Sequence, residues 1–161
     1  MGGTDNRSRI RASQLIMLDD VRVRLAWVWL IGAGLILILL VVQSLLHAYG
    51  ELTQEAWGWF LPTMMPTLGM IITVLTYTAL DPHTSGSVVR RAFFQIALSL
   101  SVAYLVLVLL TIVMQPFAAK SAAERVDLMR TSNLWLGPVQ GIVASALGIL
   151  FVSKQKKEGR E

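Results

Sequence analysis

The chain of 161 residues contains no cysteine, and only 15% of its residues are charged. The absence of cysteine excludes disulfide exchange, thiolate catalysis and cysteine-ligated metal centres. Charge is also absent from four long stretches, which leave all 24 charged residues in the short segments around them. These uncharged stretches are residues 25–50, 56–80, 92–119 and 131–153. The side chains that most often perform acid–base chemistry are therefore missing from most of the chain.

Apolar residues predominate in the chain. Hydrophobic residues make up 55% of it, and its mean hydropathy is +0.62. A helix needs about 20 apolar residues to cross about 30 Å of hydrocarbon, and each uncharged stretch is longer than that. A charge at the bilayer centre costs about 2.5–3.5 kcal/mol on insertion scales. The sequence therefore predicts an all-α integral membrane protein, a bundle of four transmembrane helices.

The predicted domains are an N-terminal segment, 1–24, a four-span membrane domain, 25–153, and a basic tail, 154–161. We expect the spans at 25–46, 61–80, 92–114 and 134–152. Asp81 and Pro82 stop the second helix, Pro116 ends the third, and Pro138 lies near the start of the fourth. The flanking segments are too short to fold as soluble domains.

Two segments outside the spans show apolar residues at helical spacing. Residues 7–20 lead into the first span, and Ile10 and Met17 can share one face there between arginines. This pattern predicts either a short helix lying on the membrane surface or a partly ordered tail. Residues 117–131 predict a second short amphipathic helix, with Lys120 and Glu124 as an i,i+4 pair. Docking of a partner on this second helix is an alternative.

The basic residues predict the orientation. Eleven of the fourteen lie before the first span, between the second and third, or after the fourth. Lysine and arginine are enriched in cytoplasmic loops, so we expect both termini in the cytoplasm, in a multi-pass protein of a bacterial inner membrane. Aromatic residues are expected to form belts at the two membrane surfaces. The inner belt comprises Trp27, Trp29, Phe93 and Phe94, and the outer belt Trp57, Trp59, Phe60 and Trp135.

The fourth span contains a series of small residues. Gly137, Gly141 and Ser145 recur at a spacing of four, and Gly148 continues the same side. Small residues let helix backbones approach closely, and van der Waals contact then holds the helices together in lipid. The pattern predicts helix packing, first inside the bundle, and alternatively with a second copy or another protein.

The second span combines prolines with hydroxyl groups. Pro62 and Pro66 remove backbone donors, and polar or small residues follow on roughly one side. These residues are Gly69, Thr73, Thr76 and Tyr77. One interpretation is a kinked helix that lines a pore. The favoured one is a bent packing helix whose threonines bond to carbonyls of their own helix.

Few residues suggest chemistry. Amides and hydroxyls in the spans are expected to join helices. They are Gln43, Ser44, Gln95, Ser99, Gln115 and Gln140. His47, Glu51 and Glu55 would share a face if the first helix continued outward, which makes them a weak candidate for a metal site. We prefer the interpretation that these three residues lie in a solvated loop, and we expect His83 to lie in a turn. No catalytic residue, cofactor or nucleic-acid module is identified.

These features favour a structural or assembly subunit without intrinsic catalysis. Its expected partners are the lipid bilayer and other membrane subunits or copies of itself, with no nucleic acid. The alternative is a self-assembling pore or channel. In chain length and number of spans the protein also resembles the microsomal glutathione transferase class, which implies an intramembrane enzyme as a third hypothesis. The charged glutathione-contacting residues of that class have no match in this sequence.

Overall fold

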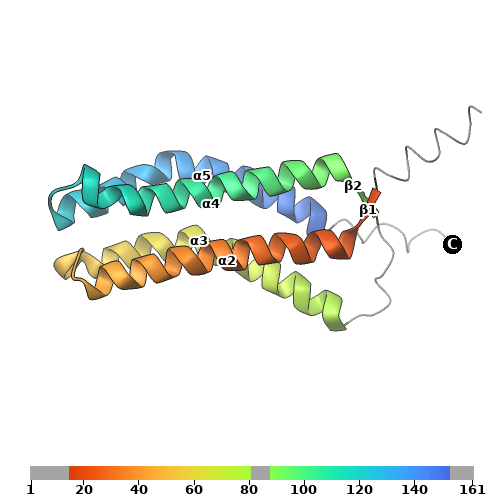
Figure 1. Cartoon of the computed structure of the whole chain (residues 1–161), viewed down its shortest axis with the longest axis horizontal. Coiled ribbons are helices and arrows are strands. Elements are labelled where there is room, and N and C mark those ends of the chain that lie inside the picture. Colours follow the sequence, from red (N-terminus) through yellow and green to blue (C-terminus); the bar gives the residue numbers. More distant parts are fainter. Residues whose placement is uncertain (1–14, 81–87, 153–161) are drawn as a thin grey trace, which may run out of the picture.

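A computed structural model of the chain describes residues 15–80 and 88–152 (Figure 1). Its main elements are four long helices. They are α2 (Leu18–Leu45), α3 (Thr53–Leu80), α4 (Arg91–Ala118) and α5 (Ala122–Val152). All four are long and apolar enough to cross a membrane, which confirms the predicted helical architecture. Insertion and the orientation of the termini remain predictions.

A short β-ribbon joins the beginnings of two helices, and the sequence pattern did not predict it. Strand β1 (Leu15–Met17) pairs antiparallel with β2 (Val88–Arg90), and Leu15 lies opposite Arg90. The predicted surface helix at 7–20, for which a partly ordered tail was the alternative, is wrong at residues 15–17, which are extended, and residues 18–20 already belong to α2. The rest of that segment lies outside the described residues, as does His83. The ribbon leads directly into α2 and α4, and Figure 1 shows it at one end of the bundle.

The predicted separate helix at 117–131 is also wrong. α4 continues to Ala118, and α5 runs without interruption from Ala122. The Ser121 hydroxyl accepts the Glu124 backbone N–H at 3.2 Å, and the Glu124 carboxylate accepts the Lys120 backbone N–H at 2.8 Å. These bonds satisfy amide donors where a helix begins. The cap therefore starts α5 at Ala122, and Pro138 lies well inside the helix rather than near its start.

The four helices form a ring in the order α2, α3, α5, α4. α4 packs most extensively on α5 and also contacts α2, while α3 contacts α5 and α2. α3 and α4 are consecutive in the chain yet lie on a diagonal of the ring, and α2 and α5 share the other diagonal with slight contact. The chain therefore crosses the bundle between α3 and α4. The order places α2 beside α4, in line with the ribbon that pairs the segments before them.

α3 does not follow its neighbours along its whole length. Figure 1 shows it changing direction near its middle, after which its C-terminal half turns away from α2. Pro62 and Pro66 lie in this part of the helix. Proline removes an intrahelical hydrogen bond and clashes with the preceding turn, which is the usual cause of a sharp bend. The predicted bent helix is confirmed.

Aromatic side chains fill much of the core, so the predicted belts are partly wrong. Trp29 is fully buried against Tyr104, with ring centroids 5.8 Å apart. Trp59, Phe60 and Phe94 are also buried. Trp27 and Trp135 are exposed, as a belt requires. Burying a large ring between helices uses its whole surface for packing, whereas sequence position alone cannot distinguish a core face from a lipid face.

One close approach between helices depends on glycine. A Cβ atom at Gly32 of α2 would lie 2.7 Å from Leu105 Cδ1 of α4. A contact this short forces the buried Leu105 side chain to move. Gly34, two residues further along α2, has no atom within 4 Å of such a Cβ. Gly32 therefore sets how closely α2 and α4 pack.

Candidate functional site

The small residues of α5 lie on the outside of the bundle. Gly137, Gly141 and Ser145 are exposed, and an added Cβ at either glycine would have nothing within 4 Å. The Ser145 hydroxyl donates to the Gly141 carbonyl of its own helix at 2.8 Å. The expectation that this side packs inside the bundle is wrong. Large apolar side chains of α5 occupy the core instead, namely Leu136, Val143, Leu147 and Leu150.

We call Gly137, Gly141 and Ser145 the α5 ridge. Gly148 is half-buried and lies at the end of the same row, again with open space beside its Cα. The ridge is thus a strip of backbone without side-chain cover in the part of the chain that the structure describes. Such a strip admits a second helix backbone at close range. Packing on this ridge remains a prediction.

The suspected polar face of α3 is also on the outer surface. Gly69, Thr73 and Thr76 are exposed, while the Tyr77 side chain lies outside the described part. The Thr73 hydroxyl donates to the Gly69 carbonyl at 2.8 Å, as expected for a helix that satisfies its own threonines. A single bundle therefore directs these residues away from its interior.

The acidic group near the first connection does not form the face that would make it a metal site. α2 ends at Leu45, and His47 takes a positive φ of 54°, so the helix does not continue to Glu51 and Glu55. Glu55 instead forms an ion pair with Arg130 of α5. Within residues 15–80 and 88–152, no three histidine, aspartate or glutamate side chains are grouped as metal ligands.

A buried polar cluster closes the end of the bundle opposite the ribbon. The Tyr49 hydroxyl lies 2.9 Å from Gln115 Oε1 and within hydrogen-bonding distance of Gln43 Oε1. Gln43 Nε2 donates to the Ile112 carbonyl at 3.3 Å. Pro116 lacks the N–H that would otherwise bond this carbonyl, so Gln43 supplies the missing donor. We call Gln43, Tyr49 and Gln115 the Tyr49 junction; it ties α2 and the first connection to α4.

Electrostatics at this junction favour the neutral phenol. Burial raises the pKa of Tyr49 to about 12, although the Arg125 charge and the Gln115 hydrogen bond act in the opposite direction. Arg125 of α5 also donates to the Ala48 carbonyl at 2.9 Å. The sequence indicated that amides join helices, which is confirmed for Gln43, Gln115 and Gln140. It did not indicate Tyr49, whose role depends on a turn placing it between helices.

A second polar joint lies between α3, α4 and α5. The Thr63 carbonyl accepts the Tyr104 hydroxyl at 2.9 Å and Gln140 Nε2 at 3.2 Å. Ser44 also joins helices, since its hydroxyl accepts Trp57 Nε1 at 3.2 Å. By contrast, Gln95 and Ser99 are exposed. Tyr104, Gln140 and Trp57 thus use their polar atoms to link helices of the bundle.

Buried charge is rare in the described part of the bundle. Among the side chains whose burial is described, Arg22 is the one charged group that is buried. Its Nη2 lies 3.5 Å from the Leu150 carbonyl at the end of α5. No family model, curated protein or solved structure matches the chain.

Proposed function

We propose that this protein is a structural or assembly subunit that binds a transmembrane helix on the α5 ridge. The observation that supports the proposal is the exposure of Gly137, Gly141 and Ser145 with open space beside both glycines. Lipid exerts no hydrophobic force that would pair helices, so association depends on close packing. A strip without side chains allows that packing, and the partner is a helix of a second copy or of another membrane subunit.

The natural absence of cysteine makes the ridge directly testable. We would introduce Gly137→Cys alone, and Gly58→Cys as a control, because Gly58 is an exposed α3 residue with nothing within 4 Å of an added Cβ. In native membranes, oxidation should link two copies through position 137, or link this protein to a neighbour through a thiol-reactive crosslinker there. Position 58 should give neither product. Equal products at both positions, or none at position 137, would contradict the proposal.

A second substitution separates assembly from folding. Gly141→Leu adds a large side chain in open space, so the isolated bundle should remain as stable as the wild type. The same side chain should block close helix approach and abolish the crosslink through position 137. Gly58→Leu is the matched control and should leave the crosslink intact. A crosslink that persists in Gly141→Leu would show that position 137 meets neighbours without using the ridge.

A further inference from the structure

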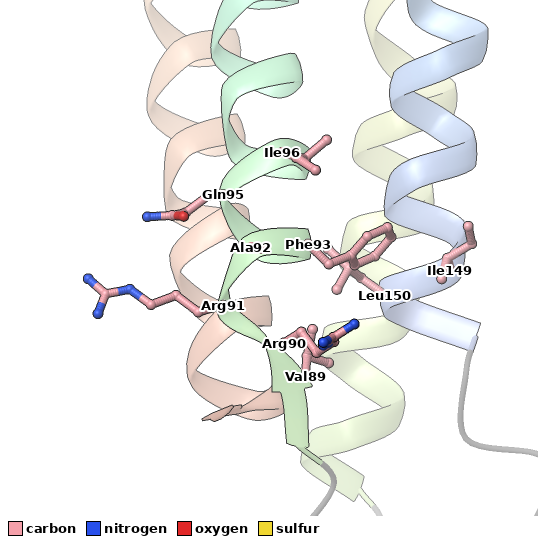
Figure 2. A pocket seen from close by; sticks show the side chains of 9 residues that line it. All are labelled: Val89, Arg90, Arg91, Ala92, Phe93, Gln95, Ile96, Ile149 and Leu150. Atoms are coloured by element: carbon pink, nitrogen blue, oxygen red, sulfur yellow. The ribbon is translucent and has the colours of Figure 1, made fainter. Parts of the chain in front are cut away.

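A groove opens at the ribbon end of the bundle between the start of α4 and the end of α5. It has a volume of about 810 Å³, within the usual range for small-molecule sites. In Figure 2, Phe93 and Ile96 extend from α4 toward α5, as does Arg90 from the residue before α4, and Leu150 extends from α5 toward α4. Ile149 lines the groove from α5. The groove therefore has one cationic end and apolar walls.

The spacing along α4 explains this division. Phe93 and Ile96 differ by three and so share one side of α4, while Arg90 is the extended residue directly before the helix. Figure 2 shows Arg91 pointing away from α5. Both arginines line the groove, but Arg90 is the one whose side chain Figure 2 shows directed toward the apolar walls.

Two arginines, Arg90 and Arg91, are adjacent in the chain where α4 begins. Arg90 is the N-cap of α4 but makes no side-chain cap bond, and the first turn of α4 holds no acidic residue. Neither the Arg90 nor the Arg91 side chain has a hydrogen bond or ion pair with the described residues 15–80 and 88–152. A helix N-terminus favours anions and disfavours cations. An anion placed beside Arg90 would relieve that unfavourable arrangement.

The apolar part of the groove indicates what else the ligand contains. Ile96 and Ile149 are 57% and 59% exposed, Phe93 is half-buried, and Leu150 is fully buried at the base. Arg90 directly precedes α4, one of the four helices apolar enough to span a membrane. A phosphate would meet Arg90, and a hydrocarbon chain would lie along these side chains. Free inorganic phosphate could satisfy the arginine but leaves the apolar walls uncovered.

We propose that this groove binds one anionic phospholipid, with its phosphate on the Arg90 guanidinium and an acyl chain between α4 and α5. Guanidinium groups bind phosphate oxygens in a bidentate manner, and basic pockets between transmembrane helices suit lipid headgroups. The site is distinct from the α5 ridge and does not depend on the proposed function. A second membrane protein bound in this groove in place of a lipid would need an acidic side chain to pair with Arg90.

The test uses the full-length protein in detergent, titrated with phosphatidylglycerol and, separately, phosphatidylcholine, with bound lipid counted by native mass spectrometry. Wild type should retain one phosphatidylglycerol in preference to phosphatidylcholine. Arg90→Gln should weaken that binding roughly tenfold, as expected for loss of a charge-assisted contact. The matched control Arg24→Gln removes the same charge from an exposed α2 residue that does not line the groove, and it should change binding less than about twofold. Arg90→Lys should retain an intermediate affinity.

Two further measurements decide between ligand sources. Ile149→Ser should weaken phosphatidylglycerol binding, and millimolar inorganic phosphate should not displace the lipid. Equal losses in Arg90→Gln and Arg24→Gln would mean general attraction between the basic end and an anionic surface, which overturns the proposal. Unchanged binding in Arg90→Gln would overturn it as well. Displacement by phosphate, with no effect of Ile149→Ser, would replace the lipid site with a free-anion site.

Discussion

The hydroxyl of Tyr104 on α4 donates a 2.9 Å hydrogen bond to the backbone carbonyl of Thr63 on α3, across a diagonal of the bundle. Gln140 of α5 donates to the same carbonyl. One acceptor near the prolines of α3 thus connects three helices. Both donors, Tyr104 and Gln140, have buried or half-buried side chains.

Removal of the Tyr104 hydroxyl should therefore weaken the bundle modestly. Tyr104→Phe keeps the ring against Trp29 and should lower the free energy of unfolding by about 0.5–1.5 kcal/mol. The Thr63 carbonyl retains Gln140 as a donor in this variant, so Tyr104→Phe with Gln140→Leu should cost more than the sum of the two single changes. Reversible unfolding in mixed micelles measures all four proteins. Strict additivity would show that the two donors do not share one acceptor.

The close approach of α2 and α4 gives a paired prediction at two glycines. Gly32→Ala should displace the buried Leu105 side chain, whereas Gly34→Ala meets no atom within 4 Å and gains helix propensity. We expect Gly32→Ala to be less stable than Gly34→Ala by about 1 kcal/mol or more. Thermal denaturation of the two purified variants tests this difference. Equal melting temperatures would mean that Leu105 adapts without cost.

The raised pKa of Tyr49 predicts loss of stability in alkali. A group whose pKa is higher in the folded state binds its proton more tightly there, so its contribution is complete below the unfolded value. For Tyr49 that contribution should fall as the pH rises from 10.0 toward about 12. Tyr49→Phe should be less stable than wild type at neutral pH, and the difference should shrink over this range. A difference that stays constant would show that Tyr49 titrates normally.

Membrane orientation follows from the distribution of lysine and arginine. Reporter fusions after residues 86 and 161 should behave as cytoplasmic, and fusions near Thr53 and Ala123 as external. In the structure, Thr53 is the first residue of α3, and Ala123 lies in the first turn of α5. These positions are consistent with two fusion sites at one end of the bundle. A cytoplasmic signal at residue 123 together with an external C-terminus would contradict the four-span orientation.

The pore hypothesis predicts the opposite of the subunit hypothesis in liposomes. Gly69, Thr73 and Thr76 face outward, so a wet path lined by them would need several copies. We expect the purified protein alone to give no ion flux beyond the leak of empty vesicles. Reproducible currents that change in Thr73→Val or Thr76→Val, with folding intact, would favour the pore.

The sequence by itself determined the all-α fold and its four long apolar helices, because four long stretches without charge are each long enough to form a helix that could cross a membrane. It also identified amides such as Gln43 and Gln140 as helix-joining groups, since a polar side chain in an apolar span needs a partner.

Only the tertiary structure decided which face of each helix turns inward. In a soluble bundle the apolar side is the inner side, but here both sides are apolar. The sequence therefore predicted that Trp29 lies at the membrane surface, whereas the structure buries it in the core. The sequence predicted that Gly141 packs inside the bundle, whereas the structure exposes it. Contacts between residues distant in the chain likewise determine the ring order, the β-ribbon and the Tyr49 junction. Gln43 and Gln115, for example, come together only when the helices pack. Hydropathy along a single chain does not encode those contacts, because lipid and a neighbouring helix are nearly equivalent apolar surroundings.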